Sequence, residues 1–177
     1  MTASEQRATS PPKGGIARLA LGHGHEVAGV VYGTIIAMAT LTASYANIKD
    51  AWELVAIVWS TLFVLWVAHV YSHGLAESMA RRRRLDRAEL KSLSRRELGI
   101  LLSAAGPTLA LLLGALDVVT LSASVWLALG IGLGILGVEG LRYARLEKLG
   151  VGATLGITAA NLALGVLVVA LKIGVTH

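Results

Sequence analysis

The chain has 177 residues, of which 55% are hydrophobic and only 15% are charged, and its net charge is +5. A soluble domain usually carries about 25% charged residues, so this composition argues against a soluble globular protein. The sequence contains no cysteine, which excludes disulfides, iron–sulfur clusters and thiolate metal sites.

Five long apolar runs, separated by short polar segments, dominate the sequence. They are Val27–Ala46, Leu54–Ala76, Leu98–Leu116, Leu121–Val138 and Val151–Leu171. A helix of about 20 apolar residues is long enough to cross the hydrocarbon core of a bilayer. The runs therefore predict an all-α, polytopic membrane protein with five transmembrane helices. We expect a disordered tail over residues 1–22, a first helix that begins near His25, and a transmembrane domain over residues 23–177.

The basic residues fall almost entirely on one side of the predicted membrane. The tail, the second polar segment and the fourth polar segment hold 14 of the 16 lysines and arginines, whereas the opposite side holds only Lys49 and Lys172. The positive-inside rule then places the N-terminus in the cytoplasm and the C-terminus outside. The chain is predicted to be a multi-pass protein of the inner (plasma) membrane.

The second polar segment, at about residues 78–97, is predicted to be a basic cytoplasmic loop. Its Leu85, Leu90 and Leu93, set among charges, favour a short helix that lies on the membrane surface. The run of Arg81, Arg82, Arg83 and Arg84 is interpreted as a topology signal that also binds anionic lipid. Nucleic-acid binding is not predicted, because no aromatic residues alternate with these arginines.

Local signals predict how the second and third helices begin, and where the third one bends. Two sequences fit capping boxes, which are Asp50 with Glu53 and Ser94 with Glu97. Pro107 follows Gly106 in the middle of the third run and should kink that helix. The carbonyl group that loses its donor needs another partner in lipid, for which Ser103 or a neighbouring helix is a candidate.

Small residues recur at helical spacing in the fourth and fifth runs. They are Gly130, Gly134 and Gly137 in the fourth run, and Gly152, Gly156 and Ala163 in the fifth. Such residues let helix backbones approach closely in lipid. They predict either packing between these two helices within one chain or the contact face of a homodimer.

The second run carries the most informative polar pattern. His69, His73 and Glu77 are spaced four residues apart, so they share one face of a helix, which should point into the bundle. The predicted topology brings further candidates to the same level, which are His25, Glu26, Glu97 and Glu139. Imidazole and carboxylate groups without sulfur suit Zn²⁺, Fe²⁺ or Mn²⁺, and they also relay protons. The alternative is that these groups are solvated at the headgroup level or paired with the arginines.

The layout also resembles the vacuolar iron transporter family. The matching stretches are His23-Gly-His25-Glu26, Val27-Ala-Gly-Val-Val-Tyr-Gly33, Gly74-Leu-Ala-Glu77 and Gly106-Pro107. The resemblance implies five spans, a cytoplasmic N-terminus rich in His and Glu, and divalent metal as the substrate. That family has an aspartate within its first span and an acidic second loop, whereas Val27–Ala46 has no acid and the second loop here is basic. The chain is equally similar to small integral membrane proteins of bacteria.

Two functions are compatible with these features. The first is a transporter for a divalent cation or for protons, in which His69, His73 and Glu77 line the route and Glu26 or Glu139 completes it. The second is a non-catalytic auxiliary protein whose basic loop contacts anionic lipid or a partner. An enzyme is not predicted, because the sequence has no nucleophile motif and no strong metal motif.

Overall fold

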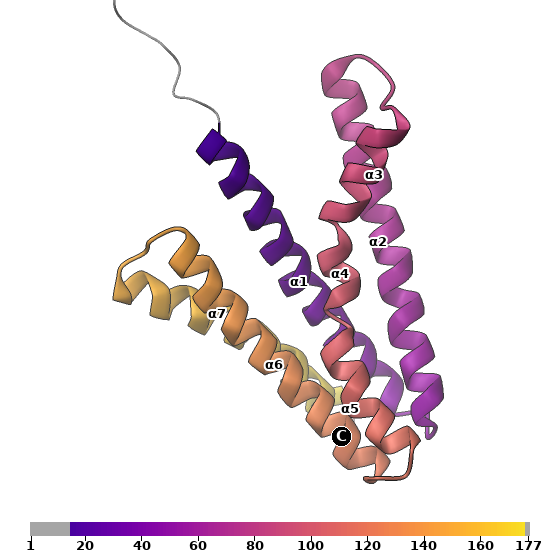
Figure 1. Ribbon diagram of the computed structural model, residues 1–177. Coiled ribbons are helices and arrows are strands. Elements are labelled where there is room, and N and C mark those ends of the chain that lie inside the picture. Colours follow the sequence, from indigo (N-terminus) through magenta and orange to yellow (C-terminus); the bar gives the residue numbers. More distant parts are fainter. Residues whose placement is uncertain (1–14, 176–177) are drawn as a thin grey trace, which may run out of the picture.

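The computed structural model describes the backbone of residues 15–175 and the side chains of residues 27–170. The described chain is helical and contains no strand, which confirms the predicted all-α class (Figure 1). Its elements are α1 (Gly15–Tyr45), α2 (Ala51–Arg81), α3 (Arg87–Arg96), α4 (Leu98–Leu102), α5 (Ala105–Ala115), α6 (Leu121–Leu146) and α7 (Val151–Val175).

Four of the described helices are long and apolar enough to cross a membrane on their own. Their apolar parts are Val27–Tyr45, Ala51–Arg81, Leu121–Leu146 and Val151–Ala170. A fifth span results if the continuous segment from α3 to α4 is counted together with α5, from which it is bent by 44°. The helices thus support a membrane protein with four or five spans.

The first helix begins earlier than the sequence predicts. Helix α1 starts at Gly15, so residues 15–22, which we assigned to a disordered tail, belong to the helix. The segment that follows Gly15 consists mostly of alanine, leucine and arginine, which are strong helix formers. Residues 1–14 lie outside the described part of the chain.

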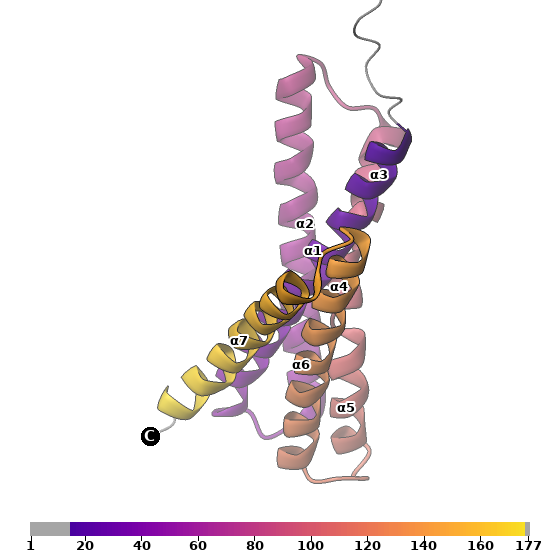
Figure 2. The same cartoon turned by 90° about the vertical axis from the view of Figure 1, so that its left-hand side faces the viewer.

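Helix α1 lies at the centre of the bundle. It contacts α2, α4, α6 and α7, whereas α7 contacts mainly α6 and α1. In Figure 2, α7 slopes away from α2, α5 and α6, in the same direction as α1. Among the described side chains, the large and fully buried ones of the core come from α1, α2, α4, α5 and α6. They are Met38, Leu41, Leu54, Leu62, Ile100, Leu111, Leu129 and Leu136.

The contact between α1 and α4 is unusually close. A Cβ atom added at Gly33 would overlap Ser103 Oγ and would lie 2.7 Å from the carbonyl oxygen of Ile100. One turn earlier, a Cβ at Gly29 would lie 3.5 Å from the backbone nitrogen of Ile100. The two glycines therefore let the backbone of α4 lie directly on α1, as small residues do in membrane helix pairs.

The predicted bend in the third span is confirmed, and it lies just before Pro107. Proline has no N–H group, so the regular ladder is interrupted between α4 and α5. The amide of Ala104 donates to Leu101 at 3.1 Å, one residue short of the α-helical partner, which is Ile100. Ser103 Oγ donates to the carbonyl of Ile100 at 2.6 Å instead. Ser103 thus satisfies a carbonyl that the break exposes, as a helix in lipid requires.

The predicted basic loop is a helical hairpin. Helix α2 continues to Arg81, and α3 folds back beside it (Figure 1). A Cβ at Gly74 of α2 would lie 3.5 to 4.0 Å from carbon atoms of Leu85, Leu90 and Leu93. The predicted short helix is confirmed as α3, and these three leucines lie beside Gly74 of α2. The location of this helix on the membrane surface stays a prediction. We call residues 77–96 the basic hairpin.

The predicted capping box at Ser94 is also wrong. Ser94 lies inside α3, where its hydroxyl donates to the carbonyl of Leu90 at 2.8 Å. The capping box is instead at the start of α3, where Asp86 accepts from the amide of Glu89 at 2.7 Å and Glu89 accepts from the amide of Asp86 at 2.9 Å. At α2 the expected N-cap is confirmed, since Asp50 accepts from the amide of Trp52.

Helices α6 and α7 pack together, but mostly through glycines other than those predicted. A Cβ at Gly140 would lie 2.9 Å from Thr158 Cα, and one at Gly165 would lie 2.6 Å from Leu133 Cδ2. In contrast, a Cβ would meet nothing within 4 Å at Gly130, Gly134, Gly152 or Gly156. Of the predicted glycines, only Gly137 faces α7, with Leu162 at 3.6 Å. The homodimer stays a prediction.

We predict that Gly33→Ala destabilises the bundle by about 1–3 kcal/mol, because the added methyl group would overlap atoms of α4 that include backbone. Gly130→Ala is the matched control, since it adds the same group in open space and removes a helical glycine, which is neutral or stabilising by up to about 1 kcal/mol. Reversible unfolding in mixed detergent micelles measures both. Equal stability of the two variants would show that the α1–α4 contact is looser than described.

Candidate functional site

The histidines of α2 lie beside α1. The ring of His69 is 5.2 Å from the ring of Tyr32 in α1 and 5.8 Å from the ring of His73, measured between centroids. His69 Nδ1 is 3.2 Å from the carbonyl oxygen of Leu65 one turn earlier, so it donates to that oxygen. These rings form a short aromatic row between α1 and α2.

His73 connects α2 to the start of the third span. Its Nδ1 is 2.8 Å from Glu97 Oε1, and the two residues lie 24 positions apart in the chain. The side chain of Glu97 is only 6% exposed, whereas that of His73 is 46% exposed. A buried carboxylate needs a hydrogen-bond partner to offset the loss of water, and His73 is that partner.

Glu77 belongs to an ion-pair network within the basic hairpin. It pairs with Arg81, whose Nη1 is 2.7 Å from Glu89 Oε1. Arg83 also binds Glu89, with Nη1 at 2.9 Å from Oε2. The hydrogen bond from Arg83, together with that from the amide of Asp86, lowers the pKa of Glu89 to about 2. Glu89 is therefore ionised at neutral pH, and its pairs with the arginines persist there.

The other basic residues of the hairpin do not take part in this network. Their side chains are exposed and have no ion-pair or hydrogen-bond partner among the described residues. They are Arg82, Arg84, Arg87, Lys91, Arg95 and Arg96. Of the four consecutive arginines, Arg81 and Arg83 thus hold the hairpin together, whereas Arg82 and Arg84 face outward.

Glu139 is buried in α6 and has one partner. Its Oε1 lies 3.4 Å from Arg142 Nη1, whereas its Oε2 is buried without a hydrogen bond among the described residues. The neighbouring residue Gly140 packs on Thr158, whose hydroxyl is also buried without a partner. The α6–α7 contact therefore contains two polar atoms that no described group satisfies.

The predicted metal ligands can be followed only in part, and the described ones do not come together. Among the described side chains, no group of three His, Asp or Glu residues is placed to hold an ion, so Zn²⁺, Fe²⁺ and Mn²⁺ gain no support. The physical reason is that the candidates are paired elsewhere, since His73 binds Glu97 and Glu77 binds Arg81. His25 and Glu26 are in α1, but their side chains lie outside the described set.

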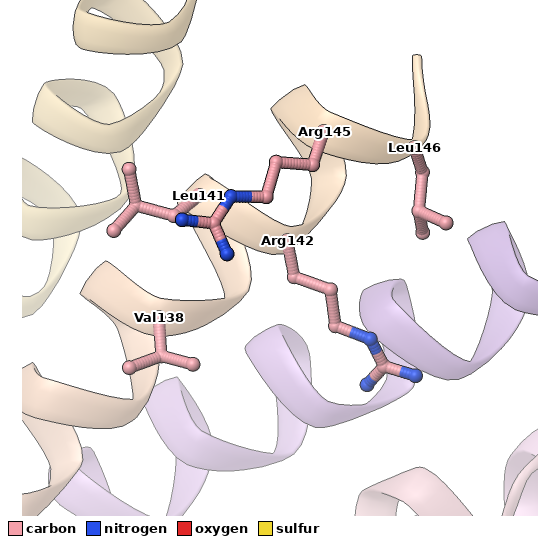
Figure 3. A pocket seen from close by; sticks show the side chains of 5 residues that line it. All are labelled: Val138, Leu141, Arg142, Arg145 and Leu146. Atoms are coloured by element: carbon pink, nitrogen blue, oxygen red, sulfur yellow. The ribbon is translucent and has the colours of Figure 1, made fainter. Parts of the chain in front are cut away.

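Sequence reasoning missed one feature at this end of the molecule. A groove runs along the last turns of α6, and its described lining consists of Val138, Leu141, Arg142, Arg145 and Leu146 (Figure 3). Residues 138, 141, 142 and 145 are spaced at i, i+3, i+4 and i+7, which is the pattern of one helix face. This spacing could have predicted the groove, but Arg142 and Arg145 were interpreted from the sequence only as signals of membrane topology.

Comparisons with models of protein families, with curated proteins and with solved structures gave no match. The resemblance to the vacuolar iron transporter family therefore stays a prediction.

We predict that His73 and Glu97 are energetically coupled. His73→Ala leaves a buried carboxylate unpaired, so the double variant with Glu97→Gln should be less destabilised than the sum of the single variants by about 1–3 kcal/mol. Unfolding in mixed micelles of the four proteins gives the coupling energy. As a control, Ser60→Ala, whose hydroxyl bonds only within its own helix turn, should be additive with Glu97→Gln. Additivity of the histidine pair would contradict this assignment.

Proposed function

We propose that the chain is a non-catalytic integral membrane protein whose basic hairpin binds the anionic headgroups of one leaflet. The observation that carries this proposal is the set of exposed cations on α2 and α3 that no described acid neutralises. The acids of the hairpin are already used, because Asp86 caps α3 and Glu77 and Glu89 bind Arg81 and Arg83.

The length of α2 supports this placement. Its 31 residues correspond to a helix of about 46 Å, whereas the hydrocarbon core is about 30 Å thick and the whole bilayer about 40–45 Å. If α2 enters the membrane near Ala51, its last turns lie among the headgroups. Helix α3 then returns through the same layer, which brings its cations beside lipid phosphates.

The charge distribution supports a location in the inner (plasma) membrane with the basic end in the cytoplasm. The α2–α3 turn and the start of α1 lie at the same end in Figure 1, and the α6–α7 turn lies on that side of the bundle.

The membrane topology can be tested with single cysteines, because the chain has no cysteine of its own. We predict that a cysteine at Ala88 reacts only from the cytoplasmic side and one at Ile48 only from outside. The reverse pattern would place the hairpin in the wrong leaflet for this function.

We predict that the protein prefers anionic lipid. Spin-labelled phosphatidylglycerol should associate with the reconstituted protein several-fold more strongly than spin-labelled phosphatidylcholine. Replacing Arg82, Arg84 and Arg87 by glutamine should reduce that preference, because each basic residue near the surface contributes about 1 kcal/mol. High salt should reduce it too, since ions screen exposed charges.

The matched control replaces the same three arginines by lysine, which keeps the charge and should keep most of the preference. Arg81 and Arg83 are left unchanged because they stabilise the hairpin through Glu89. If wild-type protein shows equal association with both lipids, the proposed function is wrong.

One observation favours transport as the competing function, namely the unpartnered Oε2 of buried Glu139. An acid in that position is a typical member of a proton or cation route. Proteoliposomes that contain a pH-sensitive dye separate the two functions. Proton or divalent-cation uptake that is lost in Glu139→Gln would replace our proposal with a transporter.

A further inference from the structure

The groove on α6 combines apolar and cationic walls at the basic end of the molecule. It has a volume of about 480 Å³, and its described lining residues all come from the last turns of α6. In Figure 3, the guanidinium group of Arg145 extends above Leu141, and Arg142 points toward α1. One part of the groove is thus lined by Val138 and Leu141, and another part carries two positive charges.

The position of the groove matches the boundary between hydrocarbon and headgroups. Helix α6 begins at Leu121, so Val138 lies about 26 Å and Arg145 about 36 Å along the axis of the helix. The hydrocarbon core ends at about 30 Å, between these two residues. An amphiphile in the groove would therefore have its tail beside Val138 and its headgroup beside Arg145.

The charges of the groove favour an anionic headgroup. Arg142 is partly neutralised by Glu139, which is 3.4 Å away, so Arg145 is the main cation. The following turn adds Glu147 and Lys148, whose charges cancel. A guanidinium group binds phosphate oxygens through two parallel hydrogen bonds, and basic pockets on transmembrane helices bind anionic lipid headgroups.

We propose that this groove is a discrete binding site for one anionic phospholipid, with the phosphate on Arg145 and an acyl chain along Leu141 and Val138. This inference goes beyond the proposed function, because the basic hairpin contacts many exchanging lipids, whereas the groove retains one. A volume of about 480 Å³ encloses the phosphate, the glycerol and the upper part of a chain, and the remainder lies on the surface of the bundle.

Native mass spectrometry of the full chain in a neutral detergent tests the site. With added phosphatidylglycerol, the wild-type protein should retain one lipid per chain, and it should retain at least about tenfold less phosphatidylcholine. Arg145→Gln should lower the retained phosphatidylglycerol about tenfold or more, because it removes the main phosphate ligand. Leu141→Trp should lower it by filling the groove while every charge stays in place.

Two further variants separate this site from the basic hairpin. Lys148→Gln removes a nearby charge that does not line the groove and should leave the retained lipid unchanged. The hairpin variant with Arg82, Arg84 and Arg87 replaced by glutamine should also keep its one lipid. If the hairpin variant alone loses that lipid, the groove proposal fails. If wild type retains the one lipid but shows no preference in the spin-label experiment, only the proposed function fails.

Other occupants give different results, and each would overturn the proposal. Equal retention of phosphatidylcholine would identify a nonspecific apolar groove. Displacement of the lipid by inorganic phosphate would identify a free-anion site. A dimer that replaces the bound lipid would identify the groove as a contact between copies. Retention in both Arg145→Gln and Leu141→Trp, with folding confirmed by circular dichroism and gel filtration, would place the lipid elsewhere.

Discussion

The contact of α1 with the broken third span constrains the positions of most other helices. Lipid provides no hydrophobic drive between helices, so their association depends on close packing and hydrogen bonds. Gly33 supplies the space for that packing, and Ser103 satisfies the carbonyl of Ile100 at the point of contact. Because α1 also contacts α2, α6 and α7, a change in the packing of α1 on α4 would move three other helices.

At the polar end of the molecule, the structure depends instead on ion pairs and hydrogen bonds of two glutamates. Glu97 is buried and binds His73, and Glu89 joins Arg81 and Arg83 while it caps α3. These pairs fold the segment after α2 into a helical hairpin. They also leave an excess of exposed cations on its outer surface, which is the surface that we propose to bind anionic lipid.

Local composition was sufficient to predict the helices and the bend. Four of the five apolar runs correspond to the single helices α1, α2, α6 and α7, and the third run corresponds to the bent pair of α4 and α5. Pro107 marks the break because it has no N–H to donate. The partners of individual side chains were not predictable in this way. Gly33 and Gly130 look alike in sequence, and only the approach of α4 makes one of them essential to packing.

The hairpin shows the same limit. The stretch with Leu85, Leu90 and Leu93 was sufficient to predict the short helix α3, whereas the approach of these leucines to Gly74 of α2 depends on the fold. For the candidate site, the sequence correctly identified which residues are polar and at which end they lie. It could not show that Glu97 is the hydrogen-bond partner of His73.

The sparse packing of α7 has a mechanical consequence. Only 6% of its apolar window is buried inside the protein, so acyl chains are its main neighbours. A helix in that situation changes its inclination when the hydrophobic thickness of the bilayer changes, whereas helices that are packed inside a core keep their inclination. Differences in membrane thickness should therefore change the inclination of α7 before that of α1, whose apolar window is 44% buried.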